Sequence, residues 1–265
     1  MSPFDALLLG LVQGLTEFLP VSSSGHLALA EKLLGLRGDD LAFVVFVHFG
    51  TMLATMTAFW PQVWGMLRSG GLFVMRKNHP GDPHLKMLGL VLLGTVPAAL
   101  VGLLLEESVE RIFSSPILVS IMLLITGLIL WLTHYFRSGG RSLGIRESIL
   151  VGCAQALAIL PGISRSGATI SAGLYQKVDR DQAVEFSFLL ALPAILGATI
   201  LKGVDLLKAP PSSRAIMTLC IGTIAAYISG YVAIKVLLSI VRKGKLRYFA
   251  LYCWAVGLIG LLFSI

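Results

Sequence analysis

The sequence predicts an all-α polytopic membrane protein with an inverted-topology repeat. Three observations carry this prediction: an apolar composition, several long apolar segments and an internal repeat. Of the 265 residues, 56% are hydrophobic and only 13% are charged, whereas soluble domains carry about 25% charged residues. The net charge of +7 is spread over short loops, which is typical of membrane topology. A nucleic-acid partner is therefore not expected.

Apolar segments of two kinds follow one another along the chain. A membrane-spanning helix needs roughly 20 apolar residues, and six uninterrupted segments approach this length: 42–60, 86–105, 116–136, 184–203, 215–240 and 247–265. Two others, 3–36 and 147–177, are broken at "LPVSSSGH" and "LPGISRSGAT". Non-helical backbone at membrane depth is tolerated only where protein or water shelters it. The sequence therefore predicts six full transmembrane spans and two re-entrant helical hairpins.

The two broken segments are related by an internal repeat. "GLVQGLTEFLPVSSSG" (10–25) aligns without a gap with "GCAQALAILPGISRSG" (152–167), and "LGTVPAALVG" (93–102) resembles "IGTIAAYISG" (221–230). Fixed-period self-similarity indicates repeated structural units. We therefore expect one membrane domain, 1–265, made of two repeats, 1–140 and 141–265. Three crossings in each half orient the halves in opposite directions.

Loop charges predict the orientation of the chain. Basic residues gather in three loops on one predicted side: Arg68, Arg76, Lys77 and Lys86 in 61–86; Arg137, Arg141 and Arg146 in 137–146; Arg242, Lys243, Lys245 and Arg247 in 242–247. A loop on the opposite side carries Glu106, Glu107 and Glu110. Basic loops face the cytoplasm. The first hairpin then enters the membrane from outside and the second from inside.

Both breaks predict an anion-binding site. "SSSG" precedes "HLALAEKLLG" and "SRSG" precedes "ATISAGLYQ", so serines occupy helix N-cap positions, where free N–H groups and the helix dipole favour phosphate. The guanidinium of Arg165 adds a fork suited to phosphate oxygens. The substrate-binding candidates are Gln13, Ser22, Ser24, Gly25, Ser164, Ser166, Gly167 and Thr169. For Ser22, Ser166 and Thr169 taken singly, the alternative is a hydroxyl that only bonds backbone.

Four polar side chains near the first break are candidates for chemistry. Gln13 and Glu17 lie four residues apart, hence on one helix face, and a carboxylate at membrane depth is costly and usually functional. Glu17 could be a metal ligand, a general base or a structural partner of Arg165. Ser23 is a candidate nucleophile. His26 could exchange protons or be a satisfied core histidine, whereas His48 is interpreted as structural.

Both motifs resemble those of a known family. "QGLTEFLPVSSSGH" is similar to the (E/Q)xxxE and PxSSxGH signature of the undecaprenyl-pyrophosphate phosphatase family of the bacitracin-resistance type, and "LPGISRSGATIS" to its PGxSRSxxT motif. The match extends over the whole chain, including "EFSFLLALP" (185–193). The resemblance implies a multi-pass enzyme of the bacterial inner membrane. Such an enzyme releases phosphate from undecaprenyl diphosphate, recycles the lipid carrier for peptidoglycan and confers bacitracin resistance.

The resemblance also implies site residues and a cofactor. The family's catalytic positions match Glu17, Ser23, His26 and Arg165. Its divalent cation, Mg²⁺ or Ca²⁺, would be held by Gln13 and Glu17, and its site opens toward the periplasm. The family accepts Glu or Gln at position 13, so a mechanism that needs two carboxylates is in question here. A polyprenyl-phosphate transporter or flippase is the alternative function, because broken helices in inverted repeats are typical of transporters. The oligomeric state is left open, a homo-oligomer included.

Overall fold

The computed structural model describes residues 1–36, 41–77, 79, 81–104, 116–136, 139–208 and 212–263. Within this part of the chain the regular structure consists of eleven α-helices and one short 3-10 helix, besides a single β-bridge between Arg141 and Val178. The predicted acidic loop with Glu106, Glu107 and Glu110 lies outside the described residues, as does Arg137.

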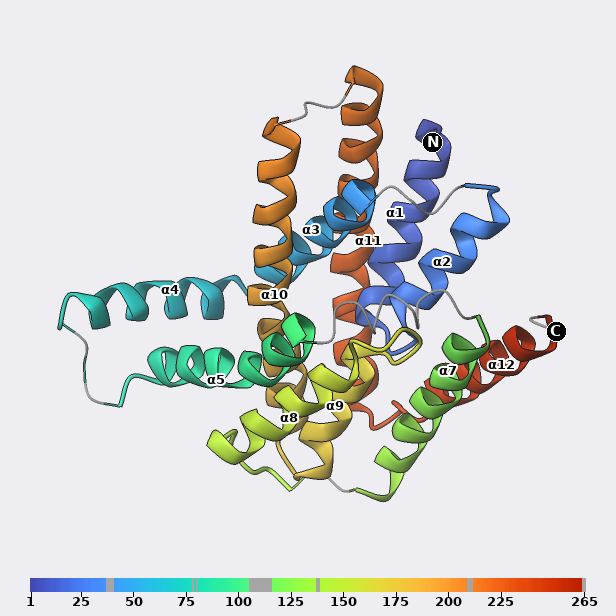
Figure 1. Ribbon diagram of the computed structural model, residues 1–265. Coiled ribbons are helices and arrows are strands. Elements are labelled where there is room, and N and C mark those ends of the chain that lie inside the picture. Colours follow the sequence, from blue (N-terminus) through green and yellow to red (C-terminus); the bar gives the residue numbers. More distant parts are fainter. Residues whose placement is uncertain are drawn as a thin grey trace.

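All eight predicted apolar segments contain helices (Figure 1). The two broken segments form helix pairs, α1 (Pro3–Phe18) with α2 (Ser23–Leu33) and α8 (Ile145–Leu157) with α9 (Arg165–Tyr175). The uninterrupted segments form α3 (Leu41–Ala58), α5 (Pro83–Leu104), α7 (Pro116–Leu132) followed by the 3-10 helix Thr133–Tyr135, α10 (Arg180–Lys208), α11 (Ser213–Arg242) and α12 (Tyr248–Phe263).

The length and composition of these helices make the chain a polytopic membrane protein. Four helical stretches are long and apolar enough to cross a bilayer: Pro83–Leu104, Ile117–Tyr135, Arg180–Leu201 and Ser213–Arg242. The bent pair of α3 and α4 (Trp60–Val74) is a fifth candidate. The division into two inverted repeats stays a prediction.

Helix α4 was not expected, because the sequence interpretation treated 61–86 as a loop. Phe59 leaves the helical conformation and Pro61 follows in the first turn of α4, which a proline tolerates because that N–H has no intrahelical partner. The chain turns by 88° between α3 and α4. Val63, Met66 and Ser69 form the narrow buried face of α4. Because only this face of α4 is buried, the other positions do not have to be apolar, and the segment therefore lacks the continuous apolar run by which the other helices were predicted.

Small residues bring each broken helix against a span from the other half of the chain. Helix α1 packs most extensively on α11, and α8 packs on α5. A methyl group added at Gly10 would overlap the carbonyl oxygen of Gly222, and one added at Gly152 would overlap that of Gly94. Gly10 matches Gly152 in the repeat, and Gly94 matches Gly222. The two close helix contacts, of the kind that small residues permit in membranes, are thus formed by equivalent glycines.

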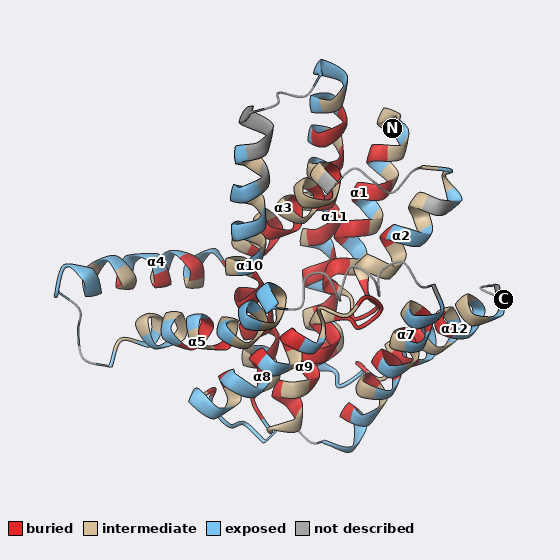
Figure 2. Ribbon diagram, viewed as in Figure 1, coloured by how far each residue is buried: buried red, intermediate tan, exposed pale blue. Residues whose placement is uncertain are grey.

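Burial follows the pattern of a protein surrounded by lipid (Figure 2). Buried residues concentrate where α1, α9, α10 and α11 meet, and the large side chains in this core include Phe18, Phe186 and Phe188. Many outward-facing side chains are large and apolar, for example Leu92, Leu100, Leu103, Ile200, Ile224, Ile228 and Leu262. In water such a surface would mark an interaction site or an aggregation risk, whereas in a bilayer it is the lipid-facing surface.

Basic residues meet at one end of the molecule, where α9 is followed by α10 and α11 by α12. The backbone N–H of Arg141 donates to the carbonyl oxygen of Lys177, Arg180 donates to the carbonyl oxygen of Arg242, and Arg247 contacts His134. Two of the predicted basic loops, 137–146 and 242–247, therefore belong to the same end as far as they are described.

Candidate active site

The first break turns the chain sharply between α1 and α2. Helix α1 ends at Phe18 with Leu19 as its C-cap, and Pro20 follows. Ser22 adopts a left-handed backbone with φ of 70°, which is uncommon for a residue other than glycine and is concentrated at functional sites. This turn starts α2 at Ser23 and brings its hydroxyl back against α1.

The second break is fixed by a third helix. Gly162 supplies the positive φ, 94°, and the Ser164 side chain caps α9 by accepting a hydrogen bond from the Gly167 N–H at 3.1 Å. Thr126 of α7 donates to the Gly162 carbonyl at 2.9 Å and accepts from the Ser164 N–H at 3.1 Å. Buried polar backbone is thereby satisfied inside protein.

The two breaks carry equivalent hydroxyl pairs. The Oγ atoms of Ser22 and Ser24 are 3.3 Å apart, and those of their repeat equivalents Ser164 and Ser166 are also 3.3 Å apart. Between each pair stands a residue that differs, Ser23 in the first break and Arg165 in the second.

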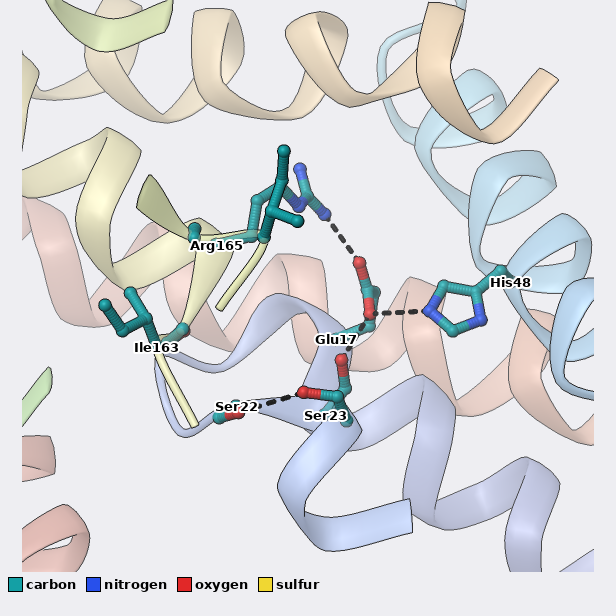
Figure 3. A pocket seen from close by; sticks show the side chains of 10 residues that line it. Glu17, Ser22, Ser23, His48, Ile163 and Arg165 are labelled. Atoms are coloured by element: carbon teal, nitrogen blue, oxygen red, sulfur yellow. Dashed lines mark hydrogen bonds and ion pairs between the residues drawn. The ribbon is translucent and has the colours of Figure 1, made fainter. Parts of the chain in front are cut away.

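A cavity of about 150 Å³ lies between the two breaks (Figure 3). Its walls combine hydroxyl, carboxylate, imidazole and guanidinium groups with a few aliphatic side chains. The lining residues are Glu17, Ser22, Ser23, Ser24, His48, Ala158, Ile159, Ile163, Ser164 and Arg165. The structure therefore brings together three of the four predicted catalytic residues.

The carboxylate of Glu17 is the centre of this pocket (Figure 3). Its Oε1 accepts a hydrogen bond from Nη2 of Arg165 at 2.8 Å. Its Oε2 accepts from the Ser23 hydroxyl at 2.6 Å and from Nε2 of Gln13 at 3.0 Å. Arg165 also donates from Nη1 to the Ser187 carbonyl at 3.3 Å. Loss of one partner of such a buried pair typically costs about 3–5 kcal/mol, because the other charge is left unpaired.

His48 belongs to the pocket, contrary to the structural role that the sequence interpretation gave it. Its Nε2 lies 3.6 Å from Oε2 of Glu17, and its Nδ1 lies 2.8 Å from the Val44 carbonyl oxygen. A carbonyl only accepts, so Nδ1 carries a hydrogen and Nε2 faces the carboxylate. The repeat argument missed His48 because its equivalent is Leu190. An ionisable side chain in the apolar segment 42–60 was the signal that could have found it.

His26 is turned toward α12 in this structure. Its Nδ1 is 2.9 Å from the Ser22 carbonyl oxygen, and its Nε2 is 2.6 Å from the Tyr252 hydroxyl. The two rings are stacked, with centroids 5.6 Å apart. His26 is not among the described residues that line the pocket. A catalytic role for His26 stays a prediction.

The predicted substrate-binding residues fall into two groups. Ser22, Ser24 and Ser164 line the pocket. Ser166 and Thr169 are not among the described lining residues. The Ser166 hydroxyl donates to the Leu19 carbonyl oxygen at 3.4 Å, and the Thr169 hydroxyl lies 2.5 Å from the Ser187 hydroxyl. Gly167 and Gly25 lie in the first turns of α9 and α2, and a methyl group at Gly167 would crowd Ser164.

The donor set offers part of a site for a divalent cation. Gln13 is fully buried, and its Oε1 accepts no hydrogen bond from the described residues. Nε2 of Gln13 faces the Glu17 carboxylate. If the Gln13 amide were turned around, its oxygen would face a carboxylate oxygen, and neither atom could donate a hydrogen bond. Among the described residues no group of three or more His, Cys, Asp and Glu side chains could hold a metal ion. Gln13 and Glu17 supply oxygen atoms of the kind that hard cations prefer, and a divalent cation held by them stays a prediction.

Comparisons with known proteins show the family of the chain. The model of the family "Bacitracin resistance protein BacA" matches residues 6–259. An undecaprenyl-diphosphatase of Salinibacter ruber is 46% identical over 270 residues, covering 98% of this chain and 99% of the relative. Those of Desulforapulum autotrophicum (40% identical, 99% and 98% covered) and Halothermothrix orenii (42% identical, 97% and 96% covered) are similar to the same extent. The chain therefore belongs to the bacitracin resistance protein BacA family.

Proposed function

We propose that this chain is a phosphatase that hydrolyses undecaprenyl diphosphate to undecaprenyl phosphate and inorganic phosphate. The recycled monophosphate would serve peptidoglycan and other envelope polymers, and its supply would confer bacitracin resistance. The names of the relatives support this substrate. The observation that carries the proposal is the hydrogen bond of 2.6 Å from the Ser23 hydroxyl to the Glu17 carboxylate, because a nucleophile needs a base within this distance.

Ser23 and Glu17 have complementary roles in the proposed reaction. The Ser23 oxygen attacks the terminal phosphorus, a new O–P bond forms, and the bond to the lipid monophosphate breaks. Glu17 takes the proton of Ser23. Water then replaces the serine oxygen on phosphorus, Ser23 regains its proton and phosphate leaves. In such chemistry most of the catalysis comes from positioning and charge stabilisation, which the serine-loop N–H groups and Arg165 would supply.

The charges of the pocket support a role for a divalent cation. Glu17 and Arg165 form an ion pair, so their charges cancel before substrate enters. A terminal phosphate alone brings a charge of about −1.5 to −2. Mg²⁺ or Ca²⁺, held by Gln13 and Glu17 together with the phosphates, would neutralise this excess. The phosphates themselves would lie against the four serines that line the pocket.

We place the chain in the bacterial inner membrane with six spans and two re-entrant hairpins. The basic end formed by Arg141, Lys177, Arg180, Arg242 and Arg247 supports a cytoplasmic location for that end. The first hairpin then enters from the periplasm, and the active site opens to that side. The lipid tail of the substrate would remain between the helices in the bilayer.

Phosphate release from undecaprenyl diphosphate by the detergent-solubilised chain tests the proposal. We expect divalent-cation-dependent release by the native chain and loss of release in Glu17→Ala and Arg165→Ala. Thr16→Ala is the matched control, because the Thr16 hydroxyl only donates to the Val12 carbonyl of its own helix. A native chain that binds the lipid but releases no phosphate would contradict the proposal and favour a transporter.

Acid quenching of turnover with substrate labelled in the terminal phosphate tests the role of Ser23. We expect a labelled phosphoserine at Ser23 and a large loss of turnover in Ser23→Ala. Near-normal turnover in Ser23→Ala would show that this hydroxyl only binds phosphate and that water attacks directly.

A further inference from the structure

A second hollow, distinct from the active site, lies at the C-terminal end of α11. This basic groove has a volume of about 310 Å³ and is lined by Lys235, Leu238, Ser239, Arg242 and Lys243. The spacing of these residues puts all five on one face of the helix. None of them lines the pocket around Glu17.

The basic groove holds more positive charge than its neighbours neutralise. Nε of Arg242 donates to Oδ1 of Asp181 at 2.8 Å, so one cation is paired. Arg180 adds a further cation beside the groove, where its Nη1 donates to the Arg242 carbonyl at 2.8 Å. The Lys235 ammonium lies 5.3 Å from the centroid of the Tyr231 ring. The carboxylate of Asp179 accepts hydrogen bonds from N–H groups at the start of α10.

An apolar stripe leads from the basic groove along the lipid-facing side of α11. Four aliphatic side chains spaced four residues apart are each between 46% and 58% exposed: Ile224, Ile228, Val232 and Val236. Val232 stands three residues before Lys235, and Val236 three before Ser239, so stripe and groove share one helix face. At 1.5 Å per residue the stripe is about 18 Å long, more than half of the roughly 30 Å hydrocarbon core.

Stripe and groove together match the two ends of a membrane lipid. We propose that this face of α11 binds an anionic glycerophospholipid, with its phosphate in the basic groove and an acyl chain along the stripe. Basic pockets beside transmembrane helices recognise anionic headgroups in this way. The 30-residue length of α11 exceeds the roughly 20 residues that a bilayer core requires, so its charged end reaches the headgroup layer. Lys235, seven residues before the helix end, is exposed and holds its ammonium beside the Tyr231 ring.

Native mass spectrometry of the detergent-solubilised chain tests this proposal directly. The probes are phosphatidylglycerol and phosphatidylcholine with identical acyl chains. The test variant is Lys235→Gln with Lys243→Gln, and the control is Lys77→Gln with Lys86→Gln, which removes the same charge from exposed positions elsewhere. We expect about 20- to 30-fold weaker phosphatidylglycerol binding in the test variant, from a contribution of about fivefold per lysine. The control should bind like the native chain, and phosphatidylcholine should bind weakly to all three.

Several outcomes would overturn the proposal. Equal phosphatidylglycerol binding by test and control variants would do so, as would equal binding of the two lipids by the native chain. Displacement of phosphatidylglycerol by undecaprenyl phosphate at equal concentration would identify a different occupant. If the double variant melts well below the native chain, Lys235→Gln alone carries the same comparison. Phosphate release in detergent should be unchanged in every variant, so failure here leaves the proposed phosphatase function intact.

Discussion

The two chain breaks share a pair of serine hydroxyls and differ in backbone and in chemistry. Each ends one helix and starts the next with serine hydroxyls 3.3 Å apart, but the residue of positive φ is Ser22 in the first break and Gly162, two repeat positions earlier, in the second. In the repeat alignment Ser23 is equivalent to Arg165, and Glu17 is equivalent to Ile159. All four of these residues line one pocket. In the proposed reaction the nucleophile and the base stand on one break and the fixed cation on the other.

The contrast at positions 17 and 159 gives the largest expected effect. Glu17→Gln keeps the side-chain shape but removes the proton acceptor next to Ser23, so we expect turnover to fall about a thousandfold. Glu185→Gln is the matched control, because this carboxylate of α10 accepts only a long hydrogen bond of 3.4 Å from Gln62 among the contacts described. Phosphate-release kinetics measure both. Turnover within tenfold of native for Glu17→Gln would assign the base elsewhere.

The equivalent helix contacts at Gly10 and Gly152 give the next largest effect. In Gly10→Ala or Gly152→Ala the new methyl group meets a backbone carbonyl of α11 or α5, and such overpacking costs about 1–3 kcal/mol. A melting experiment in detergent should show a similar loss for both. Gly197→Ala, where nothing lies within 4 Å of the added methyl group, should be neutral or slightly stabilising. A loss confined to one of the two sites would contradict their equivalence.

His48 sharpens the comparison, because its repeat equivalent is Leu190. We expect His48→Leu to lower turnover about 10- to 100-fold, since an alkyl group then replaces the polar imidazole beside Glu17 in the pocket. His48→Gln restores a polar side chain of similar reach and should retain turnover within about fivefold. Steady-state kinetics of both variants, with separate kcat and KM, provide the test. Equal losses in the two variants would assign a role that only imidazole can fill.

The smallest effect is expected at Tyr252, which has no equivalent in the second break. Tyr252→Phe removes one hydrogen bond to His26, worth about 1 kcal/mol of stability, and should change turnover less than about fivefold. In this view His26 ties α2 to α12. A hundredfold loss of turnover would instead join Tyr252 and His26 to the catalytic group.

Much of the fold could be predicted from apolar length and from the repeat. The segments around 86–105 and 215–240 are long and, apart from one lysine each, free of charge, so helices α5 and α11 follow from composition alone. The breaks were predictable because proline, glycine and serine occur together within a few residues. The family motifs then pointed to Glu17, Ser23 and Arg165, which the structure brings into one pocket.

The remaining features depend on tertiary contacts that periodicity does not encode. His48 is about two turns into the apolar helix α3, and only the packing of α3 beside α1 directs it at Glu17. The amphipathic face of α4 is narrow, so the charged residues Arg68 and Arg76 made the segment resemble a loop. His26 is only two residues after the last of the serines in sequence, yet its ring contacts Tyr252 on the last helix.

The crossed packing of α1 on α11 and of α8 on α5 has a consequence for synthesis of the chain. Helix α1 leaves the ribosome long before its main neighbour α11 has been translated, and domains fold as their segments become available. The serine loop at Ser22 therefore acquires its lasting surroundings only near the end of translation. The contact of α8 with α5 can form as soon as α8 is made, whereas that of α1 with α11 has to wait until most of the chain has been translated.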